Sequence, residues 1–257
     1  MEKLTIVKVG GKICENPTSL NALLSDFASI EGNKLLVHGG GRLATAMAER
    51  LGIETKMVDG RRITDDQMLE VVTMVYGGLV NKRIVAGLQA LGVNALGMTG
   101  ADMNILLSHK RPVKTVDYGW VGDVDRADGV ALKSLISQGV VPVIAPLTHD
   151  GKGNILNTNA DTMAGETAKA LASLFDVTLA FCFEKEGVLR DENDDHSVIP
   201  VINRALYAEL KEQGIVSGGM LPKLDNAFAT LDAGVKEVII TKADNLRDLA
   251  QGSHLEL

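Results

Sequence analysis

Two lysines, each beside a pair of glycines, have the residue types and spacing to bind an oxygen-rich anion. Lys8 ends an apolar run just before the glycine pair at 10–11, and Lys223 follows the pair at 218–219 where a helical pattern starts. Glycine pairs leave backbone N–H groups bare, with no Cβ in the way. Lys223 would lie in a first helical turn, where the helix dipole opposes a cation, and a bound anion would explain that placement.

Three consecutive glycines, 39–41, stand between an apolar run and a helical pattern. They place bare N–H groups at a helix N-terminus, which favours anion binding. The segment 39–44 also reads G-x-G-x-x-A, so NAD binding stays open as a weaker alternative. The sequence contains no Walker P-loop. We expect His38, which precedes the glycines, to pack beneath this loop rather than to act in catalysis.

Two further segments carry polar groups that could face a ligand. Arg61 and Arg62 either are solvated or form a fork for a substrate carboxylate, and Thr64 is suited to cap the helix that follows. Asn157, Asn159 and Asp161 alternate, so an extended backbone points them to one side. Asn159 or Asp161 can cap the next helix, and a carboxylate here could orient two lysines that bind phosphate.

Alternating strand and helix patterns must position these groups. The apolar, β-branched runs predict buried strands at 4–9, 34–37, 93–96, 140–144, 177–181 and 235–240. Amphipathic stretches predict helices at 17–30, 41–51, 65–91, 130–138, 160–174, 201–213 and 219–233. This alternation indicates an α/β fold with a largely parallel sheet. Segment 103–126 breaks the rhythm and predicts a β-hairpin or a strand-rich insertion, and residues 252–257 fit no element well.

Composition excludes several classes of partner. The 257 residues include 26 Lys+Arg and 33 Asp+Glu, a net charge of −7, which argues against general binding of nucleic acid or anionic membranes. Cys14 and Cys182 are too few for a disulfide framework and predict buried thiols in a reducing compartment. The sequence holds no run of 18 apolar residues and no signal peptide, so we expect a cytoplasmic protein.

The five polar and glycine-rich segments, in this order and spacing, resemble the amino acid kinase family over about residues 4–250. The most specific segments are 59–64, 157–161 and 219–223. The resemblance implies a three-layer αβα sandwich around a largely parallel central sheet, as in carbamate kinase. It also implies two lobes: residues 1–173 for acylglutamate binding and dimerisation, and residues 174–257 for ATP binding.

The motifs are most similar to the branch of the family that phosphorylates the γ-carboxylate of N-acetylglutamate with ATP and Mg²⁺ in arginine biosynthesis. The resemblance implies catalytic roles for Lys8, Lys223 and Asp161. It implies substrate binding by Gly40, Gly41, Arg62 and Asn157. It implies ATP binding by Gly10, Gly11, Glu184, Gly187, Gly218 and Gly219. It assigns no protein ligand set to the metal, which the nucleotide phosphates and water would hold.

Glu184 departs from the family pattern, which usually has Asp there. The acyl group could be acetyl or a larger group such as succinyl. The alternatives are another kinase of this fold, acting on carbamate, glutamate, aspartate or a nucleotide, and a non-catalytic nucleotide or amino-acid sensor. The short N-terminus lacks the extra helix of arginine-inhibited hexameric relatives, so the resemblance implies a homodimer.

Overall fold

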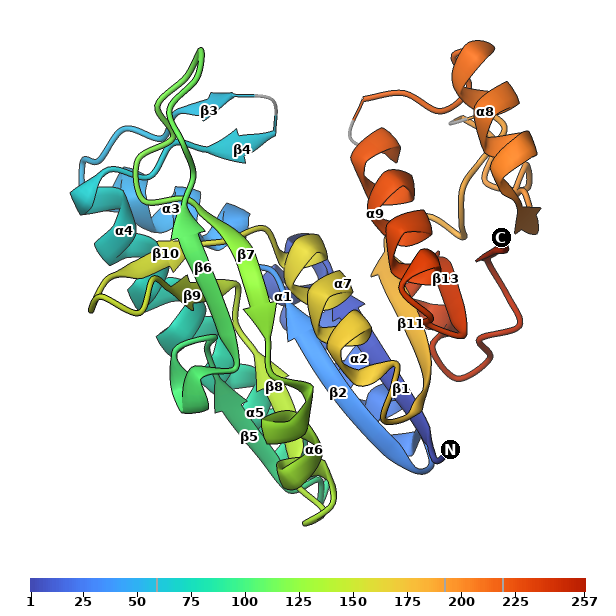
Figure 1. The fold of residues 1–257 in the computed structure, drawn as a ribbon, viewed down its shortest axis with the longest axis horizontal. Helices are drawn as coiled ribbons and strands as arrows, with labels where there is room; N and C mark the ends of the chain where they lie inside the picture. Colours follow the sequence, from blue (N-terminus) through green and yellow to red (C-terminus); the bar gives the residue numbers. More distant parts are fainter. Residues whose placement is uncertain (59, 192, 219) are drawn as a thin grey trace.

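An eight-stranded sheet forms the centre of the computed structural model, which describes residues 1–58, 60–191, 193–218 and 220–257 (Figure 1). Its strand order is β12-β14-β13-β11-β1-β2-β8-β5, and only β13 and β14 pair antiparallel. The strands are β1 (Lys3–Val9), β2 (Asn33–His38), β5 (Ala95–Met98), β8 (Val141–Ile144), β11 (Asp176–Phe183), β12 (Val201–Ile202), β13 (Glu237–Lys242) and β14 (Ser253–Leu255). The predicted, largely parallel sheet is confirmed.

Helices cover both faces of this sheet because its strands are apolar on both sides. Ile6 of β1 packs into one core cluster and the next residue, Val7, into the other. The first face is covered by α6 (Gly129–Ile136), α7 (Ala160–Leu171), α8 (Arg204–Glu212) and α9 (Met220–Asp232). The second face is covered by α1 (Gly11–Glu15), α2 (Pro17–Ser29), α3 (Gly41–Arg50), α4 (Asp66–Val72) and α5 (Asn81–Ala90). The fold is the expected three-layer αβα sandwich.

Smaller sheets lie beside the main one. The predicted hairpin at 103–126 is confirmed: β6 (Leu106–Lys110) pairs antiparallel with β7 (Gly122–Ala127). It joins β9 (Leu147–His149) and β10 (Ile155–Asn157) in a four-stranded sheet that the sequence did not predict. The two-residue strands β3 (Met57–Val58) and β4 (Arg61–Arg62) form another unpredicted pair. Elements this short carry too few residues for an alternation to be visible.

The predicted helix at 65–91 is a continuous run from Asp66 to Ala90: α4, a π-helical segment (Thr73–Val80) and α5. Its N-cap is Asp65, whose carboxylate accepts a hydrogen bond of 2.8 Å from the Met68 N–H. The prediction of a Thr64 cap is therefore wrong by one residue. In length and composition this helix could cross a membrane, but its apolar face packs against α2, α3 and the sheet, as in a core helix.

The prediction that residues 252–257 fit no element is also wrong. Ser253–Leu255 form β14, which lies between β12 and β13. Ser253 and Leu255 are buried, and the Ser253 hydroxyl accepts a 2.9 Å hydrogen bond from the Val188 N–H. The segment was missed because three residues with one apolar side chain give no strand pattern, and its pairing partners lie far away in the sequence.

Candidate active site

The candidate site lies where the carboxyl ends of β1, β2 and β11 meet the N-terminal ends of α3, α7 and α9. Open α/β sheets bind their ligands at this edge. Three recesses adjoin here, and Gly60 lines all of them. Their walls hold every described glycine, lysine, arginine, asparagine and carboxylate that the sequence singled out for the site: Lys8, Gly10, Gly11, Gly40, Gly41, Arg62, Asn157, Asp161, Glu184, Gly187, Gly218 and Lys223. Gly219 and Asp59 lie outside the described residues.

Lys8 and Asp161 form an ion pair at the centre of the site. The Lys8 Nζ lies 2.6 Å from the Asp161 Oδ1, and the lysine is 6% exposed. Asn159 is the N-cap of α7, because its side-chain oxygen accepts hydrogen bonds from the Asp161 and Thr162 N–H groups. Since Asn159 makes the cap, the Asp161 carboxylate is available to the lysine.

Lys223 lies in the first turn of α9, as predicted, and faces the same centre. Its Nζ is 3.8 Å from the centroid of the Phe183 ring, and the Lys8 Nζ is 5.0 Å from that centroid. Burial lowers the pKa of the Lys223 ammonium group, while the nearby Asp161 carboxylate opposes that effect. Two lysines thus converge on one aromatic ring and one carboxylate. The sequence predicted this grouping but not the ring.

The glycine loops after β1 and β2 pack directly on each other. The Gly39 N–H donates to the Val9 carbonyl at 3.0 Å, and a Cβ on Gly39 would lie 3.2 Å from the Gly11 nitrogen. A Cβ on Gly40 would lie 2.9 Å from the Tyr76 ring. Close packing of the loops on each other favours glycine at position 39, and close packing on Tyr76 of the long helix favours glycine at position 40.

Arg62 is a buried cation on the wall of a cavity of about 190 Å³ that Gly40, Gly41 and Asn157 also line. It is 7% exposed, and one terminal nitrogen donates to the Gly41 carbonyl at 2.7 Å and to the Thr45 hydroxyl at 2.8 Å. Within the described ranges, no carboxylate forms a salt bridge with it. A buried guanidinium without an anionic partner is suited to a carboxylate ligand.

Asn157 and Thr64 connect this cavity to the hairpin sheet. The Asn157 side-chain N–H donates to the Thr64 hydroxyl at 2.9 Å, and that hydroxyl donates to the Arg62 carbonyl at 3.1 Å. Thr64 is fully buried. Its role is thus to fix the segment that carries Arg62 rather than to cap a helix.

His38 lies beneath the glycine loop, as expected. Its Nδ1 is 2.8 Å from the Gly39 carbonyl and its Nε2 is 3.1 Å from the Asn81 side-chain nitrogen. With these partners, Nδ1–H donates and Nε2 accepts. Burial lowers the pKa of the imidazole to about 4, so the ring is neutral at physiological pH and serves the loop.

Glu184 and Gly187 follow β11 and line the third recess. The Glu184 carboxylate pairs with Lys12 of α1, a residue that the sequence analysis missed. The available signal was a lysine directly after a glycine pair. A Cβ on Gly187 would lie 2.7 Å from the Ser253 hydroxyl oxygen, so this glycine allows β14 to approach. The two free cysteines, Cys14 and Cys182, are buried near these loops, and burial raises both thiol pKa values to about 12.

Comparison with known proteins adds independent evidence. The model of the amino acid kinase family matches residues 3–242. Acetylglutamate kinase of Phocaeicola vulgatus is 69% identical over 247 residues, covering 96% of each chain. Acetylglutamate kinase of Bacteroides fragilis is 69% identical over 242 residues, covering 94% of this chain and 93% of the relative. The structure of carbamate kinase from Giardia lamblia bound to AMP-PNP superposes with a TM-score of 0.72 at 15% identity, covering 99% of this chain and 98% of that one.

Proposed function

The chain belongs to the amino acid kinase family, and on that premise we propose how its cleft transfers the γ-phosphoryl group of ATP to the γ-carboxylate of N-acetyl-L-glutamate. The product is N-acetylglutamyl 5-phosphate, in the second step of arginine biosynthesis. Relatives named for this reaction match nearly the whole chain at 58–69% identity, which supports it. The single observation that carries the mechanism is the convergence of Lys8, Asp161 and Lys223 where the recesses meet.

The two lysines stabilise the phosphoryl group during its transfer. Phosphoryl transfer depends on positioning and charge neutralisation, because charge spreads over the equatorial oxygens in the transition state. The ammonium groups of Lys8 and Lys223 supply that charge from two sides, and Asp161 holds Lys8 in place through the 2.6 Å ion pair. The attacking carboxylate is already ionised at pH 7, so no general base is needed.

The acylglutamate occupies the cavity beside Arg62. Its α-carboxylate pairs with the guanidinium, for which no carboxylate partner exists among the described residues. Asn157 and the backbone of Gly40 and Gly41 hold the remaining polar groups. The γ-carboxylate then points toward the neighbouring recess, which Asp161 and Lys223 line.

The nucleotide occupies the third recess, with its phosphates on the backbone of Gly10 and Gly11 and near Gly218, and its nucleoside toward Glu184 and Gly187. We also assign Gly219 to this site. Within the described ranges, no group of three His, Cys, Asp or Glu side chains could hold a metal ion. Asp161 is engaged by Lys8, so Mg²⁺ would enter with the nucleotide phosphates and retain much of its water. When bound, it supplies charge neutralisation at the phosphates.

The two substrates are assigned to the two sides of the cleft. We assign acylglutamate binding and dimerisation to residues 1–173 and ATP binding to residues 174–257. We place the homodimer contact on the helix Asp66–Ala90, where Met74 is 54% exposed and lines a recess with Leu69 and Trp120. We place the protein in the cytoplasm, where its free thiols would stay reduced.

A substrate panel tests the reaction. ADP release is measured with N-acetylglutamate, N-succinylglutamate, glutamate, aspartate and carbamate, and the acyl phosphate is trapped with hydroxylamine. We expect the highest kcat/KM with N-acetylglutamate. Equal rates with unblocked glutamate, or a preference for N-succinylglutamate, would contradict this substrate. Absence of turnover with ATP binding retained would favour a sensor, and NADH binding in a fluorescence titration would favour the NAD-binding alternative.

A further inference from the structure

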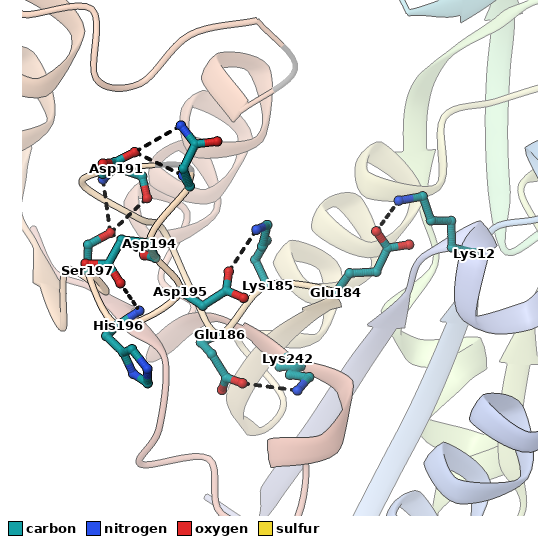
Figure 2. Close-up of polar contacts among 11 residues, drawn as sticks. Lys12, Glu184, Lys185, Glu186, Asp191, Asp194, Asp195, His196, Ser197 and Lys242 are labelled. Atoms are coloured by element: carbon teal, nitrogen blue, oxygen red, sulfur yellow. Dashed lines mark hydrogen bonds and ion pairs between the residues drawn. The ribbon is translucent and has the colours of Figure 1, made fainter.

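A third lysine, Lys12, faces the nucleotide recess and has no role in the mechanism above. It lies in α1, directly after the glycine pair at 10–11, and lines the same recess as Lys8 and Lys223. Its ammonium group pairs with Glu184, which follows β11 on the other side of the recess (Figure 2). The pair therefore joins two walls that are 172 residues apart in sequence.

Glu184 belongs to a run of three charged residues whose side chains take three different partners (Figure 2). The Lys185 Nζ lies 2.8 Å from the Asp195 carboxylate. The Glu186 carboxylate lies 3.1 Å from the Lys242 Nζ and accepts a 2.7 Å hydrogen bond from Asn245. These contacts with elements on its own side hold the segment in place. Glu184 is thereby presented toward the recess and toward α1.

The Lys12–Glu184 pair is built differently from the Lys8–Asp161 pair. The Lys12 and Glu184 side chains are 48% and 43% exposed, whereas the Lys8 and Asp161 side chains are only 7% and 13% exposed. An exposed ion pair contributes little to stability because water screens it and two long side chains must be ordered. Lys12 can therefore exchange its partner at low free-energy cost, while Lys8 cannot.

An arriving polyphosphate would be a better partner for Lys12 than Glu184 is. It carries more charge than one carboxylate and would bring its oxygens to the backbone of Gly10 and Gly11, next to Lys12. Glu184 would oppose that binding in two ways, by competing for the ammonium group and by repelling the phosphates. The same carboxylate also acts on Lys223, because its charge favours the protonated form of that lysine.

We propose that Lys12 is a third phosphate-binding lysine of the ATP site, which exchanges Glu184 for a nucleotide phosphate when the nucleotide binds. This inference rests on the proposed function. Glu184 reclaims the lysine when the nucleotide leaves, so the carboxylate limits the affinity of the site for ADP. Without Glu184 as a competitor, Lys12 would bind the product ADP more tightly.

Substitution of Lys12 and substitution of Glu184 should then change the affinity for the nucleotide in opposite directions. We expect Lys12→Met to weaken binding of ADP with Mg²⁺ about tenfold and to raise the KM for ATP, while the KM for N-acetylglutamate stays unchanged. We expect Glu184→Gln to tighten ADP binding about threefold. The double variant should bind ADP less tightly than Glu184→Gln alone. Isothermal titration calorimetry measures the affinities, and thermal unfolding measures stability.

Arg247→Met is the matched control. Arg247, whose side chain is 62% exposed, forms an ion pair with Asp26, whose side chain is 16% exposed; this pair also joins distant segments and lies outside the recess residues. Its loss should leave ADP affinity unchanged. If the Lys12 and Glu184 variants change affinity in the same direction, the pair is only structural or Glu184 holds the metal, and the proposal is overturned. Unchanged ADP affinity in Lys12→Met also overturns it. Failure of the unmodified chain to bind ADP would instead overturn the proposed function.

Discussion

At the scale of single residues, the site combines charges that stabilise the fold with charges that cost it stability. Lys8 is buried, and its ammonium group forms an ion pair with the Asp161 carboxylate, whose side chain is 13% exposed. Lys223 rests on the Phe183 ring instead, and its burial lowers the pKa of its ammonium group. The folded protein therefore holds a charge here that water would solvate better, which is typical of a functional position.

This contrast predicts different outcomes for the two lysines. We expect Lys223→Met to lower kcat by about 10²–10³ with the melting temperature unchanged or raised, since a buried charge is removed. Lys8→Met should lower kcat by at least as much and also cost about 3 kcal/mol or more, because the Asp161 carboxylate loses its partner. Steady-state kinetics and urea unfolding measure both. Near-normal turnover in either variant would refute the proposal that the two lysines stabilise the transferring phosphoryl group.

Sequence reasoning found residues whose chemistry is visible locally. Lys8, Asp161 and Lys223 stand beside glycines or a helix start, and the structure brings them together. Thr64 was misassigned because either of two adjacent residues, Thr64 and Asp65, suits an N-cap. Lys12 was missed because its significance depends on Glu184, and the chain folds these two positions together only through the β1–β11 pairing.

At the scale of elements, long apolar runs were predictable and short ones were not. Strands buried on both faces carry four or more apolar residues, as β1 and β11 do. The strands β3, β9 and β14 have two or three residues, and their pairing is decided by neighbours that pack against them. Two of the site's segments lie on such elements: Arg62 on β4 and Asn157 on β10.

The junction of β2 with α5 predicts a pH dependence of stability. His38 ends β2 and accepts a hydrogen bond from Asn81 of α5, and burial lowers its pKa from 6.5 to about 4. The unfolded chain therefore binds more protons than the folded one between pH 4 and 6.5. The neutral His38 ring therefore makes its full contribution to the free energy of unfolding above pH 6.5. That contribution, about 3 kcal/mol, is lost as the pH falls toward 4.

Urea unfolding at pH 7.5 and pH 4.5 measures this effect. In His38→Gln, whose side chain does not titrate, the difference in unfolding free energy between the two pH values should shrink by most of that amount. The two proteins are compared by this pH difference rather than by their absolute unfolding free energies, because the substitution can itself change packing. An equal pH difference in both proteins would show that other groups cause the acid sensitivity.

At the scale of the whole molecule, one sheet extends through both sides of the cleft. The β1–β11 pair joins the elements assigned to acylglutamate with those assigned to ATP (Figure 1). Tyr76, which packs against Gly40 of the cavity assigned to acylglutamate, lies in the same long helix as the proposed dimer contact. A partner on this helix would therefore support the substrate loop from behind.

The proposed dimer makes a direct prediction. We expect Met74→Asp to yield monomers, since a charge placed in an apolar contact must be desolvated. Light scattering after size exclusion measures the mass, and circular dichroism verifies the fold. Val130→Asp, at an exposed apolar position on α6, is the control and should leave the mass unchanged. If the unmodified chain is monomeric, the proposed dimer does not exist. If the Met74→Asp variant is still dimeric, the dimer contact lies elsewhere.

The position of β14 bears on how the protein is made. This strand lies between β12 and β13, yet it follows both of them along the chain. During synthesis, which proceeds from the N-terminus, the edge of β13 and the Val188 N–H therefore wait unpaired until residues 253–255 emerge from the ribosome. The side assigned to acylglutamate can form its sheet early in translation, whereas the side assigned to ATP is completed late. An exposed β13 edge is, for that interval, the place where a nascent chain of this protein is most open to a chaperone or to aggregation.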